Sequence, residues 1–307
     1  MFLIVSAIFT VLGSNSALPT SERLSSAHVL QMHGRIFLID CAEGTQILLR
    51  KNKISFNAID HIFITHLHGD HYLGIFGLLS SFNLLGRKKD IHIYGPDKMQ
   101  EILDFHVKYI ESDVSFKIHF HSVSNNSAII YEDKVLEITA IPMKHRIPTF
   151  GFLFREKPKL RNIKRDKIEA FQIPLKDIKH IKEGADFVTD NGEIIPNSVL
   201  TIAPPNPLTF AFCSDTMYNE AIIPIIENAD LLYHEATFTQ ELAGRAKETY
   251  HSTAIQAATI ALKANVKKLA IGHFSARFKN PIILENEAKT VFENTIAVRD
   301  GMSIEIV

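Results

Sequence analysis

Residues 65–71 read Thr-His-Leu-His-Gly-Asp-His, and this stretch decides the fold of the chain. It places three imidazoles and one carboxylate within six consecutive positions. The apolar, β-branched run at 59–64 predicts a buried strand before it. The mostly apolar run at 72–85 predicts a helix after it, which ends at Gly86. The cluster therefore lies on a strand-to-helix turn, and in α/β folds such turns stand at the carboxyl edge of the sheet, where ligands usually bind.

The spacing within the cluster is typical of a metal site. His66 and His68 are two residues apart, so in an extended segment their side chains lean to the same side. Gly69 permits a sharp turn that brings Asp70 and His71 towards the same space. Neutral imidazole and carboxylate together suit zinc or a similar divalent ion. A single histidine is more often an ordinary polar residue, but four ligand-type residues in six positions favour a metal site.

The sequence resembles a known family at this point. The pattern HxHxDH resembles the signature of the metallo-β-lactamase superfamily of hydrolases. Further stretches resemble one family within it, ribonuclease Z, the endonuclease that trims the 3′ end of precursor tRNA. These stretches follow the family's order and cover nearly the whole chain: LGSNSALPT (12–20), DCAEGTQ (40–46), KHRIPTFGF (144–152), FCSDT (212–216), HEATF (234–238), HST (251–253) and GHFSARF (272–278). The combination of HEAT, HST and GHFSAR is much more specific to ribonuclease Z than HxHxDH is.

The composition is that of an ordinary globular protein. The chain has 307 residues, of which 46% are hydrophobic and 22% charged, and its formal net charge is −1. This balance does not by itself indicate nucleic-acid binding, which would need positive charge concentrated locally. The two cysteines, Cys41 and Cys213, form no C-x-x-C pattern. They predict a reducing, cytoplasmic compartment and two buried small side chains.

The apolar run at 2–12 needs a separate interpretation. It has no Lys or Arg before Arg23, unlike a secretory signal. It is also too short to span a bilayer, so we expect no membrane segment. The family resemblance begins here as well. We therefore predict an edge or first strand over 7–12.

The rest of the chain predicts alternating strands and helices. The strand predictions are a hairpin of 27–32 and 35–40 about His33-Gly34, then 91–96, 117–121, 135–141, 209–213, 231–234 and 269–272. The helix predictions are 45–51, 98–109 and an alanine-rich helix over 253–264 that is capped by Ser252 or Thr253. A second hairpin about Asn191-Gly192, within 186–196, is predicted to return the chain to the core. Several of these strands deliver a ligand-type residue where they end.

Residues 155–182 carry an unusual excess of positive charge. They include ten basic and four acidic side chains, a local formal charge of about +6. Most charge runs are simply solvated faces, but this one also suits contacts to RNA phosphates. In ribonuclease Z a flexible arm protrudes at this place and grips the tRNA body. The resemblance therefore implies a protruding, tRNA-binding basic arm at about 155–182.

The resemblance also implies a set of metal ligands. One zinc ion would be held by His66, His68 and His145, the second by Asp70, His71 and His273, and Asp215 would bridge the two. The acidic residues Asp40 and Glu43 would orient histidine ligands by hydrogen bonds. His119 and His121 repeat the spacing of two residues, but they lack a nearby Asp or glycine turn. We expect them on one face of an exposed strand and not at a metal.

The catalytic roles rest on the same resemblance. His251 would act as general acid for the leaving oxygen, with Glu235 holding its ring. Without the resemblance, His251 could equally be a helix-entry residue. Asp70 would serve as metal ligand and as general base. A metal-activated hydroxide would then attack the phosphodiester in line, leaving a 3′-hydroxyl on the tRNA and a 5′-phosphate on the trailer.

The expected architecture is an α/β protein with the αββα sandwich of the metallo-β-lactamase fold. Residues 1–307 would form one domain with the inserted arm, and the resemblance implies two zinc ions per chain, a precursor tRNA substrate and a homodimer. One alternative is a small-molecule phosphodiesterase or another hydrolase of the superfamily, which the basic arm and HST disfavour. Another is an RNA-binding protein with an inactive metal site, which the complete ligand set disfavours.

Overall fold

The computed structural model describes residues 7–109, 114–124 and 127–307. The chain divides into two compact units. The first comprises the described residues up to 133 together with 137–155 and 208–307, and the second comprises 134–136 and 156–207. The apolar N-terminal run was compared above with a secretory signal. Its residues 2–6 lie outside the described residues.

The first unit is built on two mixed sheets with seven described strands each. In spatial order, the first sheet contains β18 (Ser303–Ile306), β1 (Ala7–Gly13), β2 (Ala27–Met32), β3 (Arg35–Cys41), β4 (Ile59–Phe63), β5 (Ile91–Gly95) and β6 (Ile118–Ser122). The second contains β17 (Thr295–Ala297), β16 (Leu269–Gly272), β15 (Leu231–Glu235), β14 (Thr209–Cys213), β9 (Phe150–Glu156), β8 (Leu136–Pro142) and β7 (Ile129–Glu132). The predicted first strand is therefore β1, which lies between β18 and β2 and not at an edge.

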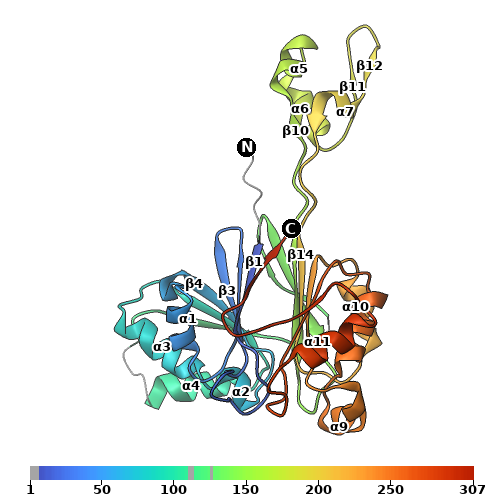
Figure 1. The fold of residues 1–307 in the computed structure, drawn as a ribbon. Coiled ribbons are helices and arrows are strands. Elements are labelled where there is room, and N and C mark those ends of the chain that lie inside the picture. Colours follow the sequence, from blue (N-terminus) through green and yellow to red (C-terminus); the bar gives the residue numbers. More distant parts are fainter. Residues whose placement is uncertain (1–6, 110–113, 125–126) are drawn as a thin grey trace. The chain divides into compact units, whose positions relative to one another are not determined.

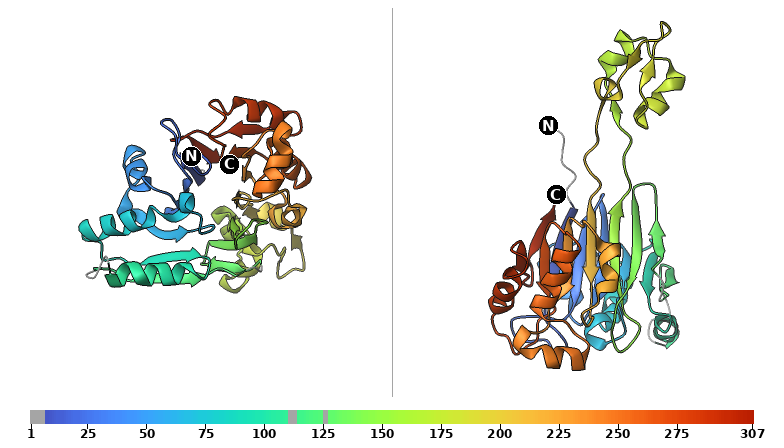
Figure 2. Two further views of the ribbon diagram at one scale, coloured as in Figure 1. Left: turned by 90° about the horizontal axis from the view of Figure 1, so that it is seen from below. Right: turned by 90° about the vertical axis from the view of Figure 1, so that its right-hand side faces the viewer.

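Helices cover the outer faces of both sheets (Figures 1 and 2). Those beside the first sheet are α1 (Thr45–Lys51), α2 (Gly69–Tyr72), α3 (Ile75–Leu84) and α4 (Met99–Tyr109), with the 3-10 turn η1 (Phe56–Ala58). Those that follow strands of the second sheet are α8 (Ile223–Ile226), α9 (Ala243–Thr249), α10 (Ala254–Lys263) and α11 (Ile282–Lys289), with η2 (Glu220–Ile222) and η3 (Gln240–Leu242). This is the helix–sheet–sheet–helix layering expected for a metallo-β-lactamase fold. Among the described residues, no helix is long and apolar enough to cross a membrane.

Aromatic side chains hold the two sheets together. Phe9 of β1 packs on Phe210 of β14 with ring centroids 4.7 Å apart, and Phe63 of β4 packs on Phe152 of β9 at 5.1 Å. All four rings are buried. Large aromatic groups contribute much of the hydrophobic stabilisation of a core, so these contacts fix how the sheets face each other. That arrangement in turn brings together the loops at the ends of strands from both sheets.

The helix predicted over 72–85 is wrong at its start, because Tyr72 is the last residue of a separate short helix. α2 ends at Tyr72 and α3 begins at Ile75. Gly74 lies between them, packed so closely on the loop after β3 that an added Cβ would lie 1.8 Å from the carbonyl oxygen of Ala42. Its N–H donates to the carbonyl of Cys41 at 2.8 Å. The predicted end at Gly86 is confirmed, since this residue has φ +73° directly after α3 and its C-cap.

Most other local predictions are confirmed. The turn of the first hairpin has positive φ at both His33 and Gly34, as a tight two-residue turn requires. Thr253 is the N-cap of α10. Its side chain accepts from the backbone N–H of Gln256, and the side chain of Gln256 accepts from the backbone N–H of Thr253. This capping box settles the choice between Ser252 and Thr253. β9 was not among the predicted strands.

The second unit has a small core of its own. Its elements are β10 (Asn162–Ile163) paired with β13 (Thr201–Ile202), α5 (Arg165–Ala170), α6 (Leu175–Lys182), β11 (Phe187–Val188) paired with β12 (Ile194–Ile195), and α7 (Asn197–Leu200). Ile173, Ile181, Phe187, Ile195 and Leu200 form a buried apolar cluster. The hairpin predicted within 186–196 is confirmed, but it packs in this unit, so the expectation that it returns to the main core is wrong.

Candidate metal centre

The predicted ligands come together from the carboxyl ends of strands in both sheets. His66 and His68 follow β4, Asp70 and His71 lie in α2, His145 follows β8, Asp215 follows β14 and His273 follows β16. The parallel strands β14, β15 and β16 all run in one direction, so their ends share one edge of the sheet. Sequence segments more than 200 residues apart thus supply one site.

The first group of ligand atoms surrounds a space the size of a metal ion. Nε2 of His66 lies 3.0 Å from Nδ1 of His68, and Nε2 of His145 lies 3.3 Å from that same Nδ1. Oδ2 of Asp215 lies 3.6 Å from Nε2 of His66. A tetrahedral ion with bonds of about 2.0 Å to nitrogen needs ligand atoms roughly 3.3 Å apart. The four side chains therefore match such an ion.

The second group has similar spacing. Nε2 of His71 lies 3.4 Å from Oδ2 of Asp70 and 3.6 Å from Oδ1 of Asp215. Nε2 of His273 lies 3.3 Å from Oδ1 of Asp215 and 3.7 Å from Oδ2 of Asp70. Asp215 thus offers Oδ1 to this group and Oδ2 to the first. One carboxylate therefore faces both groups of ligand atoms.

Unsatisfied polar atoms support the same interpretation. Nε2 of His71, Oδ1 of Asp215 and Nε2 of His273 are buried and have no hydrogen-bond partner among the described residues. A buried polar atom without a partner is costly. These three atoms all face the space between the second group of ligands. A divalent cation would satisfy them, so the residues present fit a binuclear metal site.

Asp40 orients one ligand, as expected. Its Oδ2 accepts from Nδ1 of His71 at 2.7 Å, which leaves Nε2 of that ring to face Asp70 and Asp215. Its Oδ1 accepts from the backbone N–H of Thr65 at 2.9 Å. Carboxylates in this position fix the tautomer and ring orientation of a metal-binding histidine. Glu43, in contrast, is exposed and makes no hydrogen bond or ion pair with these residues, so its expected role is wrong.

Two further hydrogen-bond partners of the predicted ligands were not expected from the sequence. The hydroxyl of Thr237 lies 3.1 Å from Nδ1 of His273 and donates to Oε2 of Glu235 at 2.8 Å. The carbonyl oxygen of Tyr250 accepts from Nδ1 of His145 at 2.9 Å. Thr237 belongs to the quoted stretch HEATF, where its position could have suggested a role. A backbone carbonyl such as that of Tyr250 leaves no signal in a sequence.

His251 and Glu235 form the predicted pair. Nδ1 of His251 donates to Oε1 of Glu235 at 2.9 Å. Burial alone would lower the pKa of His251, but the charge and hydrogen bond of Glu235, with the charge of Asp215, raise it to about 9. Burial alone would raise the pKa of Glu235, and the charge and hydrogen bond of His251 lower it below its ordinary value. His251 therefore keeps a proton at neutral pH at the edge of the site.

The carboxylates that face the ligand cluster remain ionised. Burial by itself would raise the pKa of Asp70 and Asp215, but the neighbouring histidines, His71 and His273 above all, lower both. The backbone N–H of Ala17 also donates to Oδ2 of Asp70 at 2.8 Å. Burial alone would lower the pKa of His71, but the charges of Asp215, Asp40 and Asp70 in turn raise it, so a cation that binds here would displace the proton of that ring.

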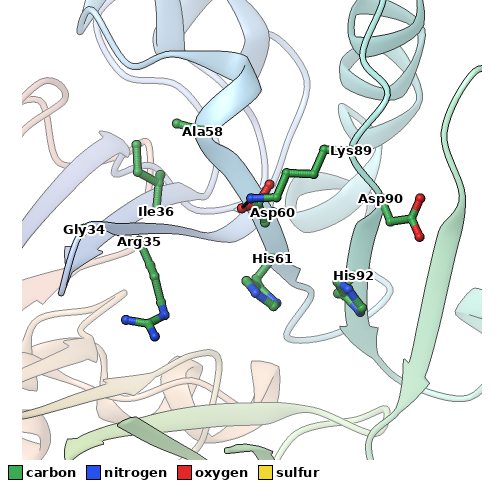
Figure 3. Close-up of a pocket in the computed structure, with 9 residues that line it drawn as sticks. All are labelled: Gly34, Arg35, Ile36, Ala58, Asp60, His61, Lys89, Asp90 and His92. Atoms are coloured by element: carbon green, nitrogen blue, oxygen red, sulfur yellow. Dashed lines mark hydrogen bonds and ion pairs between the residues drawn. The ribbon is translucent and has the colours of Figure 1, made fainter. Parts of the chain in front are cut away.

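His119 and His121 lie away from the metal centre. They stand on β6, at the edge of the first sheet, where Nε2 of His119 contacts Asp90 at 2.8 Å and Nε2 of His121 contacts His92 at 3.0 Å. Figure 3 shows the neighbouring pocket, where the side chains of Arg35, His61 and His92 point to the same side of the sheet. Among the described residues, every compact group of three or more metal-ligand side chains lies at the metal centre. His119 and His121 therefore lie on one face of a strand, as expected, but that strand is half-buried and not exposed.

The chain is similar to known proteins over nearly its whole length. The family model described as beta-lactamase superfamily domain matches residues 35–162. The chain is 43% identical to Ribonuclease Z of Bacteroides fragilis over 297 residues, which cover 96% of this chain and 98% of that protein. It is 45% identical to Ribonuclease Z of Phocaeicola vulgatus over 297 residues, covering 96% of each chain.

Solved structures give the same picture. The short form of human tRNase Z superposes with a TM-score of 0.71 at 26% identity, covering 98% of this chain and 99% of that one. The metallo-beta-lactamase fold protein YhfI of Bacillus subtilis superposes with a TM-score of 0.70 at 20% identity, covering 98% and 99%. The second likeness concerns the fold alone.

Proposed function

The chain belongs to the ribonuclease Z family, and we propose that it removes the 3′ trailer from precursor tRNA by hydrolysing one phosphodiester bond. The products would be a tRNA with a 3′-hydroxyl and a trailer with a 5′-phosphate. The observation that carries this proposal is the combination of two adjoining ligand groups with the His251–Glu235 pair at their edge. A phosphodiester hydrolase needs both parts, because one prepares the nucleophile and the other supplies a proton to the leaving oxygen.

Two zinc ions are the proposed cofactors. His66, His68 and His145 would hold one, Asp70, His71 and His273 the other, and Asp215 would contact both. When bound, such a pair supplies a hydroxide nucleophile at neutral pH and neutralises the charge that develops on the phosphoryl oxygens. Imidazole nitrogen and carboxylate oxygen are both zinc ligands, and the atoms are spaced accordingly.

Side chains of the protein would donate and accept the protons of the reaction. Nε2 of His251 would donate to the 3′-oxygen that leaves with the tRNA, while Glu235 stabilises the charged ring before the transfer. The ionised carboxylate of Asp70 would accept the proton of the attacking water. Glu235 is itself fixed, since it accepts from the backbone N–H of Thr237 at 2.9 Å and of Ser252 at 3.0 Å. The proton donor is therefore held in one orientation relative to the ligand cluster.

We propose that the second unit binds the body of the tRNA as an arm inserted into a metallo-β-lactamase domain. Exposed basic side chains on α5 and α6 support this role, among them Arg165, Lys176 and Lys179. Phosphate contacts by such side chains supply much of the affinity of proteins for RNA. The family resemblance further suggests a homodimer that acts in the cytoplasm.

Cleavage of two substrates by the same zinc-loaded protein tests the proposed function. A precursor tRNA with a 3′ trailer should be cut once, near the end of the acceptor stem. EDTA should abolish cutting, and added zinc should restore it. Turnover of bis(p-nitrophenyl) phosphate together with an intact precursor tRNA would instead identify a small-molecule phosphodiesterase.

A further inference from the structure

A second cavity adjoins the metal centre on the side of His68. It has a volume of about 660 Å³ and lies in the first unit, at the carboxyl ends of β4, β5 and β6 and beside the loop between β8 and β9. His68 lines this cavity and also the cavity that contains Asp70, Asp215 and His273. We call it the His68-side cavity. A substrate that occupies the metal centre can therefore extend into it past a single side chain.

The walls of the His68-side cavity suit a planar aromatic group. Its apolar lining consists of Leu67, Pro96, Val123, Ile147, Pro148 and Phe150. Pockets of roughly 300–1,000 Å³ with apolar walls and a few polar groups typically bind small organic ligands. A nucleobase has two apolar faces and a polar edge, whereas ribose and phosphate are polar throughout. The base is thus the part of an RNA that these walls fit.

The few polar groups stand beside these apolar walls. The hydroxyl of Ser122 donates to Oδ1 of Asp97, so this carboxylate oxygen already has a hydrogen-bond partner. Lys98 is exposed and forms no ion pair with any described residue. A free ammonium group beside an apolar cavity suits a strand of RNA, because the phosphate that follows a bound base must lie close to it.

The order of the catalytic groups shows which nucleotide would enter. The ring of His145 lies 5.0 Å from that of His68 and 5.3 Å from that of His251, measured between centroids. His145 thus neighbours both the proton donor and His68, and all three rings line the cavity of the metal centre. In the proposed reaction, His251 meets the 3′-oxygen of the tRNA. The tRNA strand therefore ends on the His251 side, and the nucleotide across the scissile phosphate faces the His68 side.

We propose that the His68-side cavity binds the nucleobase of the first trailer nucleotide, and that Lys98 contacts the phosphate that follows it. This inference rests on the proposed function and adds a binding site for the leaving strand. The faces of a base lose contact with water when they pack on these apolar walls, and this burial favours binding in proportion to the area covered. Loss of this one base should therefore reduce kcat/KM by roughly tenfold or more.

Abasic substrates test the proposal directly. Three precursor tRNAs would be compared under single-turnover conditions: one intact, one abasic at the first trailer nucleotide, and one abasic at the last tRNA nucleotide. Each would be cut by the wild type and by Ile147→Trp, in which the larger ring fills the cavity. Ile282→Trp on α11 is the matched control, because Ile282 is a partly exposed isoleucine outside the cavity.

The expected result is a coupled loss. The wild type and Ile282→Trp should cut the trailer-abasic substrate at least about tenfold more slowly than the intact one, whereas Ile147→Trp should cut both at the same reduced rate. Equal wild-type rates on intact and trailer-abasic substrates would overturn the cavity's role, even if Ile147→Trp fails to fold. The proposal would also be wrong if Ile147→Trp abolished the rate difference between the intact substrate and the one that is abasic at the last tRNA nucleotide. If the intact precursor is not cut at all, the proposed function itself fails.

Discussion

Glu235→Gln is the substitution whose effect the structure specifies most closely. It removes the negative charge that holds the pKa of His251 at about 9 while keeping the size of the side chain. The amide oxygen can still accept from Nδ1 of His251. Without the charge, the pKa of His251 should fall towards the ordinary histidine value near 6.5. A proton donor is active only in its protonated form, so the variant should lose activity as the pH rises through its lowered pKa.

The magnitude follows from the fraction of His251 that is protonated. At pH 8, a group with a pKa of about 9 is roughly 90% protonated, and a group with a pKa of about 6.5 is roughly 3% protonated. The variant should therefore be about 30-fold slower than the wild type at pH 8 and within about a factor of two of it at pH 6. With the amide oxygen in the place of Oε1, it still accepts from the N–H of Ser252, but the amide NH2 replaces Oε2 and faces the backbone N–H of Thr237. This lost hydrogen bond should cost on the order of 1–3 kcal/mol of stability.

The assay is single-turnover cleavage of precursor tRNA between pH 6 and 9. Zinc content and a thermal melt would be recorded for each variant, to separate the proton effect from misfolding. Glu241→Gln is the matched control, since Glu241 is exposed and makes no contact with the site. A variant that is slowed equally at pH 6 and pH 8, with normal zinc content, would refute the role of Glu235 in setting the pKa of His251.

Three further outcomes are expected. His68→Ala should lower the zinc content and reduce cleavage by at least about 100-fold, whereas His119→Ala should leave both unchanged; near-normal turnover of His68→Ala would refute the ligand assignment. The double variant Lys176→Glu, Lys179→Glu should bind precursor tRNA about tenfold more weakly and hydrolyse bis(p-nitrophenyl) phosphate as the wild type does; equal RNA affinity would exclude α6 from the RNA surface. Burial and the charge of His92 lower the pKa of His61 to about 4, so the folded protein keeps this ring neutral while the unfolded chain takes up a proton below about pH 6.5. Between pH 7 and pH 5, the free energy of unfolding of the wild type should therefore fall by about 1 kcal/mol more than that of His61→Gln, with the partial exposure of the ring taken into account. Identical pH dependence of the two proteins in urea titrations would contradict this.

The sequence predicted the local features of the site well, because they depend on neighbouring residues. The strand before His66, the cap at Thr253 and the turn at His33-Gly34 all follow from short-range patterns, and the structure has each of them. The pairing of His251 with Glu235 came from family resemblance, because neither residue has a spacing that reveals the other.

What the sequence did not predict depends on contacts between distant segments. The break between α2 and α3 arises because Gly74 packs on the loop after β3, more than 30 residues away. The carbonyl of Tyr250 reaches His145 across 105 positions, and no property of the tyrosine side chain signals it. Glu43 failed for the opposite reason, since a carboxylate close in sequence to Asp40, which does contact His71, can still point into solvent.

The most direct test of the central claim is a single turnover of precursor tRNA in ¹⁸O-labelled water, with mass spectrometry of both products. If water attacks the phosphorus and the 3′-oxygen leaves, one ¹⁸O atom should enter the 5′-phosphate of the trailer, and the 3′-hydroxyl of the tRNA should remain unlabelled. A tRNA that ends in a cyclic phosphate, or label found in the tRNA instead of the trailer, would contradict the assignment of His251 to the leaving oxygen and the reaction proposed for this site.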